Sequence, residues 1–296
     1  RTRESAAGIT AYSIDRRGRL AAFTLGGELF ISEISSGSPT VIENSEGAFD
    51  PRLSNDGQLV SFVINDSVYL APTDGSAAAQ LIVAGDEEMV SWGSAEFVAA
   101  EEMRRNRGHW WDSTGMKLAV TRVDVSNVTT WHISAPNEPA TIPKEIKYPA
   151  AGSPNADVQL HVIDTDDYSR TEVMWNRSTH PYLVDVSWEA NQPLTLVVQT
   201  RDQQSLQVLE ADEDTGRTEK AIEINDPYWV EIIPGTPQRW RDGWLTIQEH
   251  EQNRSLLFNG RPLSPPDQWV RSVIAADETR ILYTASVDPT VVDLWS

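Results

Sequence analysis

The feature that most constrains this sequence is a strand–turn–strand unit that recurs along its length. Residues 19–25 and 28–34 are apolar stretches joined by a Gly-Gly turn, and residues 58–63 and 67–70 repeat the arrangement. Weaker copies continue to the C-terminus at an imprecise spacing of roughly 40 to 60 residues. A single unit cannot bury both of its faces, so neighbouring units must cover it. The pattern predicts an all-β fold, a β-propeller of about six to eight four-stranded blades.

The predicted strands are apolar or alternating runs bounded by Asp, Asn and Gly turns. They cover residues 9–12, 19–25, 28–34, 51–54, 58–63, 67–70, 117–123, 158–164, 186–188, 194–199, 205–209, 243–248, 255–258, 272–277, 280–284 and 291–295. The acidic run at 210–216 predicts a hairpin tip. The 11 Trp residues suit packing between blades, and we expect most of them, including Trp110 and Trp111, to be core residues.

Residues 94–108 interrupt the β pattern and predict the one clear helix in the chain. The segment is rich in Ala, Glu, Met and Arg and contains no Pro. Ser94 is the expected N-cap, and Gly108 is the expected residue just beyond the C-terminus. A lone helix in a β-array calls for a functional reason. The candidate reason is the adjacent pair Glu101 and Glu102.

Two adjacent carboxylates are costly when they are shielded from water. At about 5 Å and an effective dielectric near 20 they repel each other by roughly 3 kcal/mol. A cation between Glu101 and Glu102 relieves this repulsion, and an ammonium group offers three N–H donors to their oxygens. The alternative is an ordinary solvated helix, since Arg104 and Arg105 lie three or four residues away. The spacing alone leaves both interpretations open.

Residues 135–157 contain repeated prolines, which exclude a central strand or a helix there. We expect an extended excursion that rejoins a sheet at residues 158–164.

Composition narrows the classes of function. The net charge of −20 argues against a nucleic-acid partner. The absence of Cys excludes disulfides, thiol catalysis and Cys-ligated metals, and it is compatible with a reducing cytoplasm without fixing the compartment. No apolar run approaches the roughly 18 residues of a membrane span, so we expect a soluble chain without a membrane partner. The chain begins at Arg1 without Met, and we expect it to be a fragment.

The sequence lacks several catalytic signatures. There is no Gly-x-Ser-x-Gly nucleophile motif, no phosphate-binding loop and no dinucleotide fingerprint. The five His residues show no metal-ligand spacing. The chain alone is therefore predicted to hold no catalytic residue, no metal and no cofactor.

Two segments resemble a known family. The first runs from Phe97 through Glu101, Glu102 and Met103 and continues over residues 110–124. The second is the Tyr-Pro-x-Ala-Gly-x-x-Asn stretch at residues 148–155. Together they resemble the N-terminal propeller domain of the dipeptidyl peptidase IV family, among the prolyl oligopeptidases, and in particular its bacterial members. The resemblance is most specific over about residues 90–165 and continues more weakly to the C-terminus.

The resemblance implies an eight-bladed propeller over residues 1–296, with an incomplete first blade. It also implies a C-terminal α/β-hydrolase domain, outside this chain, that carries a Ser-Asp-His triad and releases X-Pro or X-Ala dipeptides. Glu101 and Glu102 fall on the family's double Glu, which binds the N-terminal ammonium of a peptide substrate. The family's carbonyl-binding Arg has three candidates here, Arg1, Arg3 and Arg52, and none is assigned.

The partners implied are a peptide with a free N-terminus, the chain's own hydrolase domain and a second copy in a homodimer. One alternative is a stand-alone propeller that acts as a protein-binding scaffold, because propellers host many roles. Another is a glycoside hydrolase, which would need two carboxylates facing each other.

Overall fold

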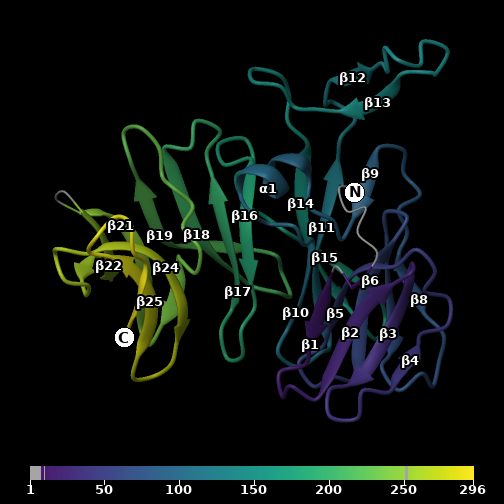
Figure 1. Ribbon diagram of the computed structural model, residues 1–296, viewed down its shortest axis with the longest axis horizontal. Coiled ribbons are helices and arrows are strands. Elements are labelled where there is room, and N and C mark those ends of the chain that lie inside the picture. Colours follow the sequence, from purple (N-terminus) through teal and green to yellow (C-terminus); the bar gives the residue numbers. More distant parts are fainter. Residues whose placement is uncertain (1–7, 10, 251–252) are drawn as a thin grey trace. The chain divides into compact units, whose positions relative to one another are not determined.

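The computed structural model describes residues 8–9, 11–250 and 253–296. The chain divides into two compact units, one formed by residues 1–201 and 206–223, the other by residues 202–205 and 224–296. The described part contains antiparallel sheets and a single short helix (Figure 1), so the all-β prediction is confirmed. No helix there has the length and apolar character that a membrane crossing requires.

Three sheets of the first unit are four-stranded meanders, in which each strand pairs with the next along the chain. Their strands are β1 (Tyr12–Ile14), β2 (Leu20–Leu25), β3 (Glu28–Glu33) and β4 (Pro39–Val41); β5 (Phe49–Leu53), β6 (Leu59–Ile64), β7 (Ser67–Pro72) and β8 (Gln80–Val83); β16 (Tyr182–Ser187), β17 (Leu194–Gln199), β18 (Ser205–Ala211) and β19 (Thr218–Asn225).

The remaining sheet of the first unit contains an insertion and an arm. Its strands are β9 (Val90–Trp92), β10 (His109–Trp111), β11 (Lys117–Asp124), β14 (Asp157–Asp164) and β15 (Arg170–Val173). The helix α1 (Phe97–Glu102) lies between β9 and β10 in sequence, and the hairpin of β12 (Thr130–Ile133) and β13 (Lys144–Lys147) lies between β11 and β14. In Figure 1 this hairpin projects away from the sheet that carries it.

The second unit contains a four-stranded and a three-stranded meander. Their strands are β20 (Gln238–Trp240), β21 (Gly243–His250), β22 (Asn253–Phe258) and β23 (Arg261–Pro262), followed by β24 (Trp269–Ala276), β25 (Ile281–Ser286) and β26 (Asp293–Trp295). The two sheets share a core that includes Leu245, Leu256, Val270 and Tyr283.

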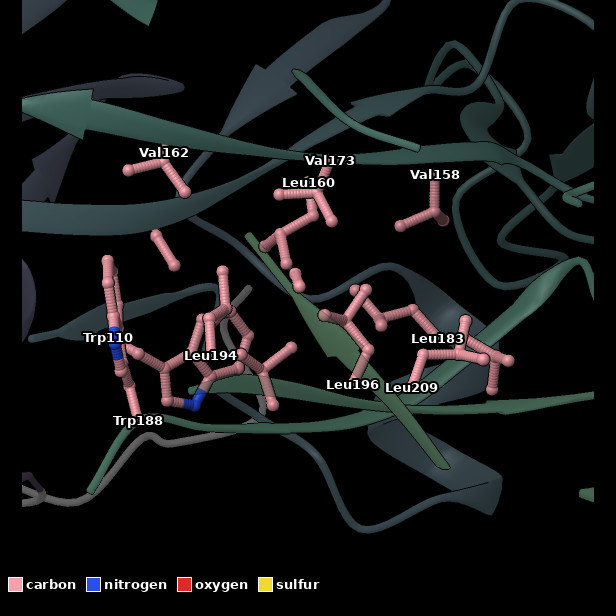
Figure 2. Packing of buried hydrophobic residues seen from close by; sticks show 14 of the residues in the cluster. Trp110, Val158, Leu160, Val162, Val173, Leu183, Trp188, Leu194, Leu196 and Leu209 are labelled. Atoms are coloured by element: carbon pink, nitrogen blue, oxygen red, sulfur yellow. The ribbon is translucent and has the colours of Figure 1, made fainter. Parts of the chain in front are cut away.

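Successive sheets in the first unit pack face to face. Leu160 and Val162 of β14 meet Leu194 and Leu196 of β17 in one buried cluster, with Trp110 at its edge (Figure 2). Equivalent clusters join β1–β4 to β5–β8, and β5–β8 to the sheet of β11. Each of these clusters removes from water one face of each of the two sheets that it joins. Burial of this apolar surface is the main stabilising contribution expected for such sheets.

The predicted strands agree closely with the observed ones, and residues 194–199 coincide with β17. The predicted strand at residues 9–12 includes Thr10, which lies outside the described residues, and β1 begins at Tyr12. The excursion at 135–157 includes residues 144–147 as β13, which pairs with β12, and the chain rejoins the sheet as β14 at Asp157. Trp110 and Trp111 are buried as predicted, as are Trp92, Trp188 and Trp244, whereas Trp131 and Trp229 are exposed.

Candidate functional site

The helix α1 lies in an insertion between β9 and β10, two short strands that pair with the same long strand, β11. Trp92 of β9 pairs with Arg122 of β11, and His109 of β10 pairs with Val120. Between them Gly93 N–H donates to the carbonyl oxygen of Thr121, and Thr121 N–H donates to that of Gly108. The ladder along β11 therefore continues without loss, although residues 93–108 leave the sheet and return.

The neck of this insertion is closed by backbone and side-chain contacts. Ser94 and Arg107 form an isolated antiparallel bridge. The Thr121 hydroxyl, fully buried, reaches the carbonyl oxygens of Ser94 at 2.9 Å and Gly108 at 3.1 Å. A Cβ on Gly108 would overlap the backbone of Gly93 and Ser94, so Gly is required there. A closed neck restricts how residues 95–106 can move relative to the sheet.

The helix is shorter than the sequence predicts, and its caps differ. It spans Phe97–Glu102, and its N-cap is Glu96, whose carboxylate accepts the N–H groups of Val98 and Ala99. Ser94 is therefore not the N-cap, because it belongs to the neck. The helix ends because Arg104 adopts φ 58°, a left-handed conformation that usually favours Gly. Gly108 is likewise part of the neck and not the residue beyond the helix C-terminus.

Glu101 and Glu102 occupy the last turn of α1, and both side chains are exposed. The carbonyl end of a helix carries partial negative charge, so this is an unfavourable place for carboxylates. The last turn, every residue of which is described, carries no basic side chain. Two adjacent anions at the negative end of a helix form a place where a cation binds favourably.

Arg105 does not serve as a surface ion-pair partner of the kind the alternative interpretation requires. It is 4% exposed, and its guanidinium donates from Nε to the carbonyl oxygen of Leu183 at 3.2 Å and from Nη1 to that of Arg107 at 2.8 Å. Leu183 belongs to β16, so this side chain links the turn after α1 to the neighbouring sheet. In Figure 1, α1 lies beside β16.

Several charged side chains lie near the turn that follows α1. Burial lowers the pKa of Arg105 to about 10, opposed by the carboxylates of Glu96 and Asp185. Burial also lowers the pKa of Arg107 to about 10 and raises the pKa of Glu96. Both arginines stay protonated at neutral pH, and their guanidinium carbons lie 5.8 and 5.2 Å from the centre of the Trp110 ring.

A second polar group adjoins Arg107. Asp50 pairs with Arg52 at 2.5 Å, and its Oδ2 lies 3.9 Å from Nδ1 of the fully buried His109. His109 Nδ1 is also 3.2 Å from the carbonyl oxygen of Gly93. Burial and two nearby arginines lower the pKa of His109 to about 4, so the ring is neutral at pH 7. Of the three arginines considered for carbonyl binding, Arg52 thus lies in this group, and Arg1 and Arg3 lie outside the described residues.

Aromatic rings connect α1 to the arm. Phe97, in the first turn of α1, packs edge-on against Tyr148 with ring centres 5.1 Å apart. Tyr148 packs in turn against Trp131 of β12 at 6.0 Å. Phe97 precedes Glu101 by one helical turn, so the contact lies on the side of the helix that carries the carboxylate.

Across residues 8–9, 11–250 and 253–296, no group of three or more His, Cys, Asp or Glu side chains is placed to hold a metal ion.

Sequence reasoning singled out the Glu pair but missed the charged groups near the turn after α1. Arg105 and Asp50 look like ordinary surface residues in the sequence, but Arg105 is buried and Asp50 is half-buried. Their surroundings depend on β16 and β5, which are distant in sequence from α1. The one local signal was the pair of glycines, Gly93 and Gly108, that flank the insertion.

The structure thus defines a class: an all-β protein of stacked antiparallel sheets whose one described helix presents two adjacent carboxylates. Within that class the chain belongs to the dipeptidyl peptidase IV (DPP IV) N-terminal region family, whose model matches residues 10–271.

Curated relatives agree with this assignment. The chain is 28% identical over 247 residues to a probable dipeptidyl-aminopeptidase B of Pyrenophora tritici-repentis, covering 73% of the chain and 28% of that protein. It is 26% identical over 249 residues to the inactive dipeptidyl peptidase 10 of Rattus norvegicus, covering 75% and 31%. The chain therefore spans less than a third of the length of either relative.

Solved structures show the same fold. The chain aligns with dipeptidyl peptidase 4 of Porphyromonas gingivalis at a TM-score of 0.77 and 15% identity, over 96% of this chain and 43% of that one. It aligns with a putative dipeptidyl aminopeptidase IV of Bacteroides ovatus at a TM-score of 0.70 and 17% identity, over 90% and 41%.

Proposed function

We propose that residues 1–296 belong to the N-terminal β-propeller domain of a serine-type dipeptidyl peptidase, with eight blades in the complete propeller. Four-stranded meanders that pack face to face in sequence order support this arrangement. The domain gates access to a C-terminal α/β-hydrolase domain that lies beyond this chain. That domain supplies the Ser-Asp-His triad and releases X-Pro or X-Ala dipeptides.

In this proposal Glu101 and Glu102 bind the N-terminal ammonium of the peptide. The observation that carries it is their place on α1: adjacent, exposed, and at the negative end of the helix without a basic residue in the last turn. An ammonium group neutralises the two charges and donates to their oxygens. No group in this chain acts on the scissile bond.

The contribution of the two carboxylates to the reaction is positioning. Holding the ammonium at a fixed distance from the nucleophilic Ser places the bond after the second residue in register for attack. The Ser then forms an acyl-enzyme with release of the remaining peptide, and water releases the dipeptide. The carboxylates convert binding energy at the peptide N-terminus into a choice of cleavage site.

The test is calorimetric binding of an X-Pro dipeptide and its N-acetylated twin to the full-length protein with its Ser disabled. We expect selective binding of the free amine, which Glu101→Gln/Glu102→Gln abolishes. A matched control is Glu87→Gln/Glu88→Gln, because these two residues are also adjacent and exposed but lie outside α1. Equal binding of both peptides, or equal loss in both double variants, would contradict an ammonium site on α1.

A second candidate, a protein-binding scaffold, is favoured by one observation. The β12–β13 arm exposes Trp131, Ile133 and Ile142, and exposed apolar groups of this kind often mark contact surfaces. A partner there includes a second copy of the chain in a homodimer. The downstream reading frame separates the candidates: a Gly-x-Ser-x-Gly motif within an α/β pattern supports the peptidase, and its absence supports the scaffold.

A further inference from the structure

Arg105 joins the end of the carboxylate-bearing helix to a different sheet. Its backbone N–H donates to the carbonyl oxygen of Ala99 in α1 at 3.0 Å, so the residue is part of the helix ending. Its side chain donates to the carbonyl oxygen of Leu183 in β16. One residue, three positions after Glu102, thus fixes the helix end to the sheet beside it.

The surroundings of Arg105 suit a guanidinium specifically. Nε donates to the carbonyl oxygen of Leu183 and Nη1 to that of Arg107, and Glu96 and Asp185 supply opposite charge. Among the described residues Nη2 finds no hydrogen-bond partner, although it is buried. Lys offers one compact charge on a flexible stem and cannot reproduce this fork.

The charge pairing also ties the two ends of α1 together. Glu96 caps the first turn through Val98 and Ala99, and its carboxylate attracts Arg105, which follows the last turn. A helix of this length gains little from its own hydrogen bonds, because nucleation is costly. The orientation of the last turn therefore depends on contacts outside the helix, among them the buried bond from Arg105 to Leu183.

We propose that Arg105 is a positioning residue, which holds the last turn of α1 against β16 and so directs the carboxylates of Glu101 and Glu102 toward the peptide ammonium. This rests on the proposed function of the Glu pair. Arg105 itself does not touch the substrate. Its effect is the register of the bound peptide, because a shift of about 1 Å in an anchor can change rates a hundredfold.

The experiment compares Arg105→Lys with Arg104→Lys in the full-length protein. Arg104 is the exposed neighbour, so its substitution keeps the charge and the chain position without touching β16. We expect Arg105→Lys to lower kcat/KM for a free-amine X-Pro substrate by about tenfold to a hundredfold, and to release a detectable share of tripeptides, with a thermal midpoint near wild type. Arg104→Lys should leave rate and products unchanged.

A purely structural role would lower the folded fraction without changing which bond is cut, so the product ratio separates the two roles. If Arg105→Lys does not fold, Glu96→Gln serves instead, since it removes the facing charge but keeps an acceptor for the helix cap. We expect it to shift the product ratio in the same direction.

The variant Glu101→Gln/Glu102→Gln distinguishes a failure of the ammonium site from a failure of the positioning role of Arg105. If that variant loses free-amine selectivity while the folded Arg105→Lys or Glu96→Gln variant keeps wild-type rate and products, only the role of Arg105 is overturned. If no variant changes selectivity, the ammonium site and its positioning residue are both overturned.

Discussion

The hydroxyl of Thr121 donates to the carbonyl oxygen of Ser94 across 2.9 Å, and this contact closes the gap from which α1 leaves its sheet. Thr121 lies on β11 opposite the gap, with Gly93 and Gly108 on either side of it. The partner strand β11 thus holds β9 and β10 together on either side of the insertion.

Thr121→Val removes the hydroxyl at nearly constant volume. The partly buried carbonyl oxygen of Ser94 then loses its side-chain donor, and we expect the free energy of unfolding to fall by about 1–3 kcal/mol. Urea titration measures this change. Thr195→Val is a suitable control, because Thr195 is also buried and donates to Pro193, but it lies on β17 away from the neck. Both variants should lose stability, whereas only Thr121→Val should weaken binding of a free-amine dipeptide.

Gly108→Ala tests the close approach at the neck. The added Cβ would overlap the backbone of Ser94, so the neck must open, and overpacking of this kind costs about 1–3 kcal/mol. Gly152→Ala is the comparison, since Gly152 adopts φ 81° in open space and pays only for its backbone conformation. A Gly108→Ala protein as stable as the wild type would show that the neck yields without cost.

His109 predicts a pH dependence of stability. Its pKa falls from an ordinary 6.5 to about 4 in the folded protein, so protonation favours the unfolded state. The stabilisation that comes from keeping His109 neutral is complete above pH 6.5. It is lost as the pH falls toward 4, by about 3 kcal/mol in total. We expect His109→Gln to flatten the curve of unfolding free energy against pH in that window.

The control for this measurement is His132→Gln, because His132 is exposed on the arm. Its curve should follow the wild type. The acids near His109 are present in both proteins, so the difference between the wild-type and His109→Gln curves isolates the histidine. Parallel curves for those two proteins would refute the assignment.

Glu102→Ala tests the carboxylate pair in the complete enzyme. Removing one partner of a charged hydrogen-bonded pair costs about 2–5 kcal/mol, so kcat/KM for an X-Pro substrate should fall by roughly 30-fold to several thousand-fold. Steady-state kinetics measures the loss, with Glu88→Ala as the exposed control outside α1. A near-wild-type rate for Glu102→Ala would remove Glu102 from the site.

Much of the fold follows from local pattern. The strands at β2, β6, β11 and β17 are apolar runs between turn residues, and such runs form strands in most packed environments. The helix was predicted too long, because Ala, Glu, Met and Arg favour a helix throughout residues 94–108. Tertiary contacts override this preference. Arg104 adopts a left-handed backbone conformation, and the side chain of Arg105 donates to the carbonyl oxygen of Leu183 in β16.

The candidate site was only partly predictable for a related reason. Glu101 and Glu102 are adjacent in sequence, so their pairing is visible without a structure. The groups around the turn come together only after folding, when Arg105 reaches the carbonyl oxygen of Leu183 and His109 approaches Asp50. Nothing in the sequence spacing indicates these contacts, because Leu183, His109 and Asp50 lie on strands of three different sheets.

The strands β9 and β10 flank the insertion and pair with the same strand, β11. The sheet therefore depends on the residues at the two ends of the insertion and not on the segment between them. Because Thr121 restores the ladder between Gly93 and Gly108, the sheet requires only that two chain ends meet at that point. The segment between them, with its own contact to β16, can therefore be exchanged for another of different length or charge while the ladder along β11 is kept. An insertion held in this way is a replaceable cassette, open to grafting in the laboratory.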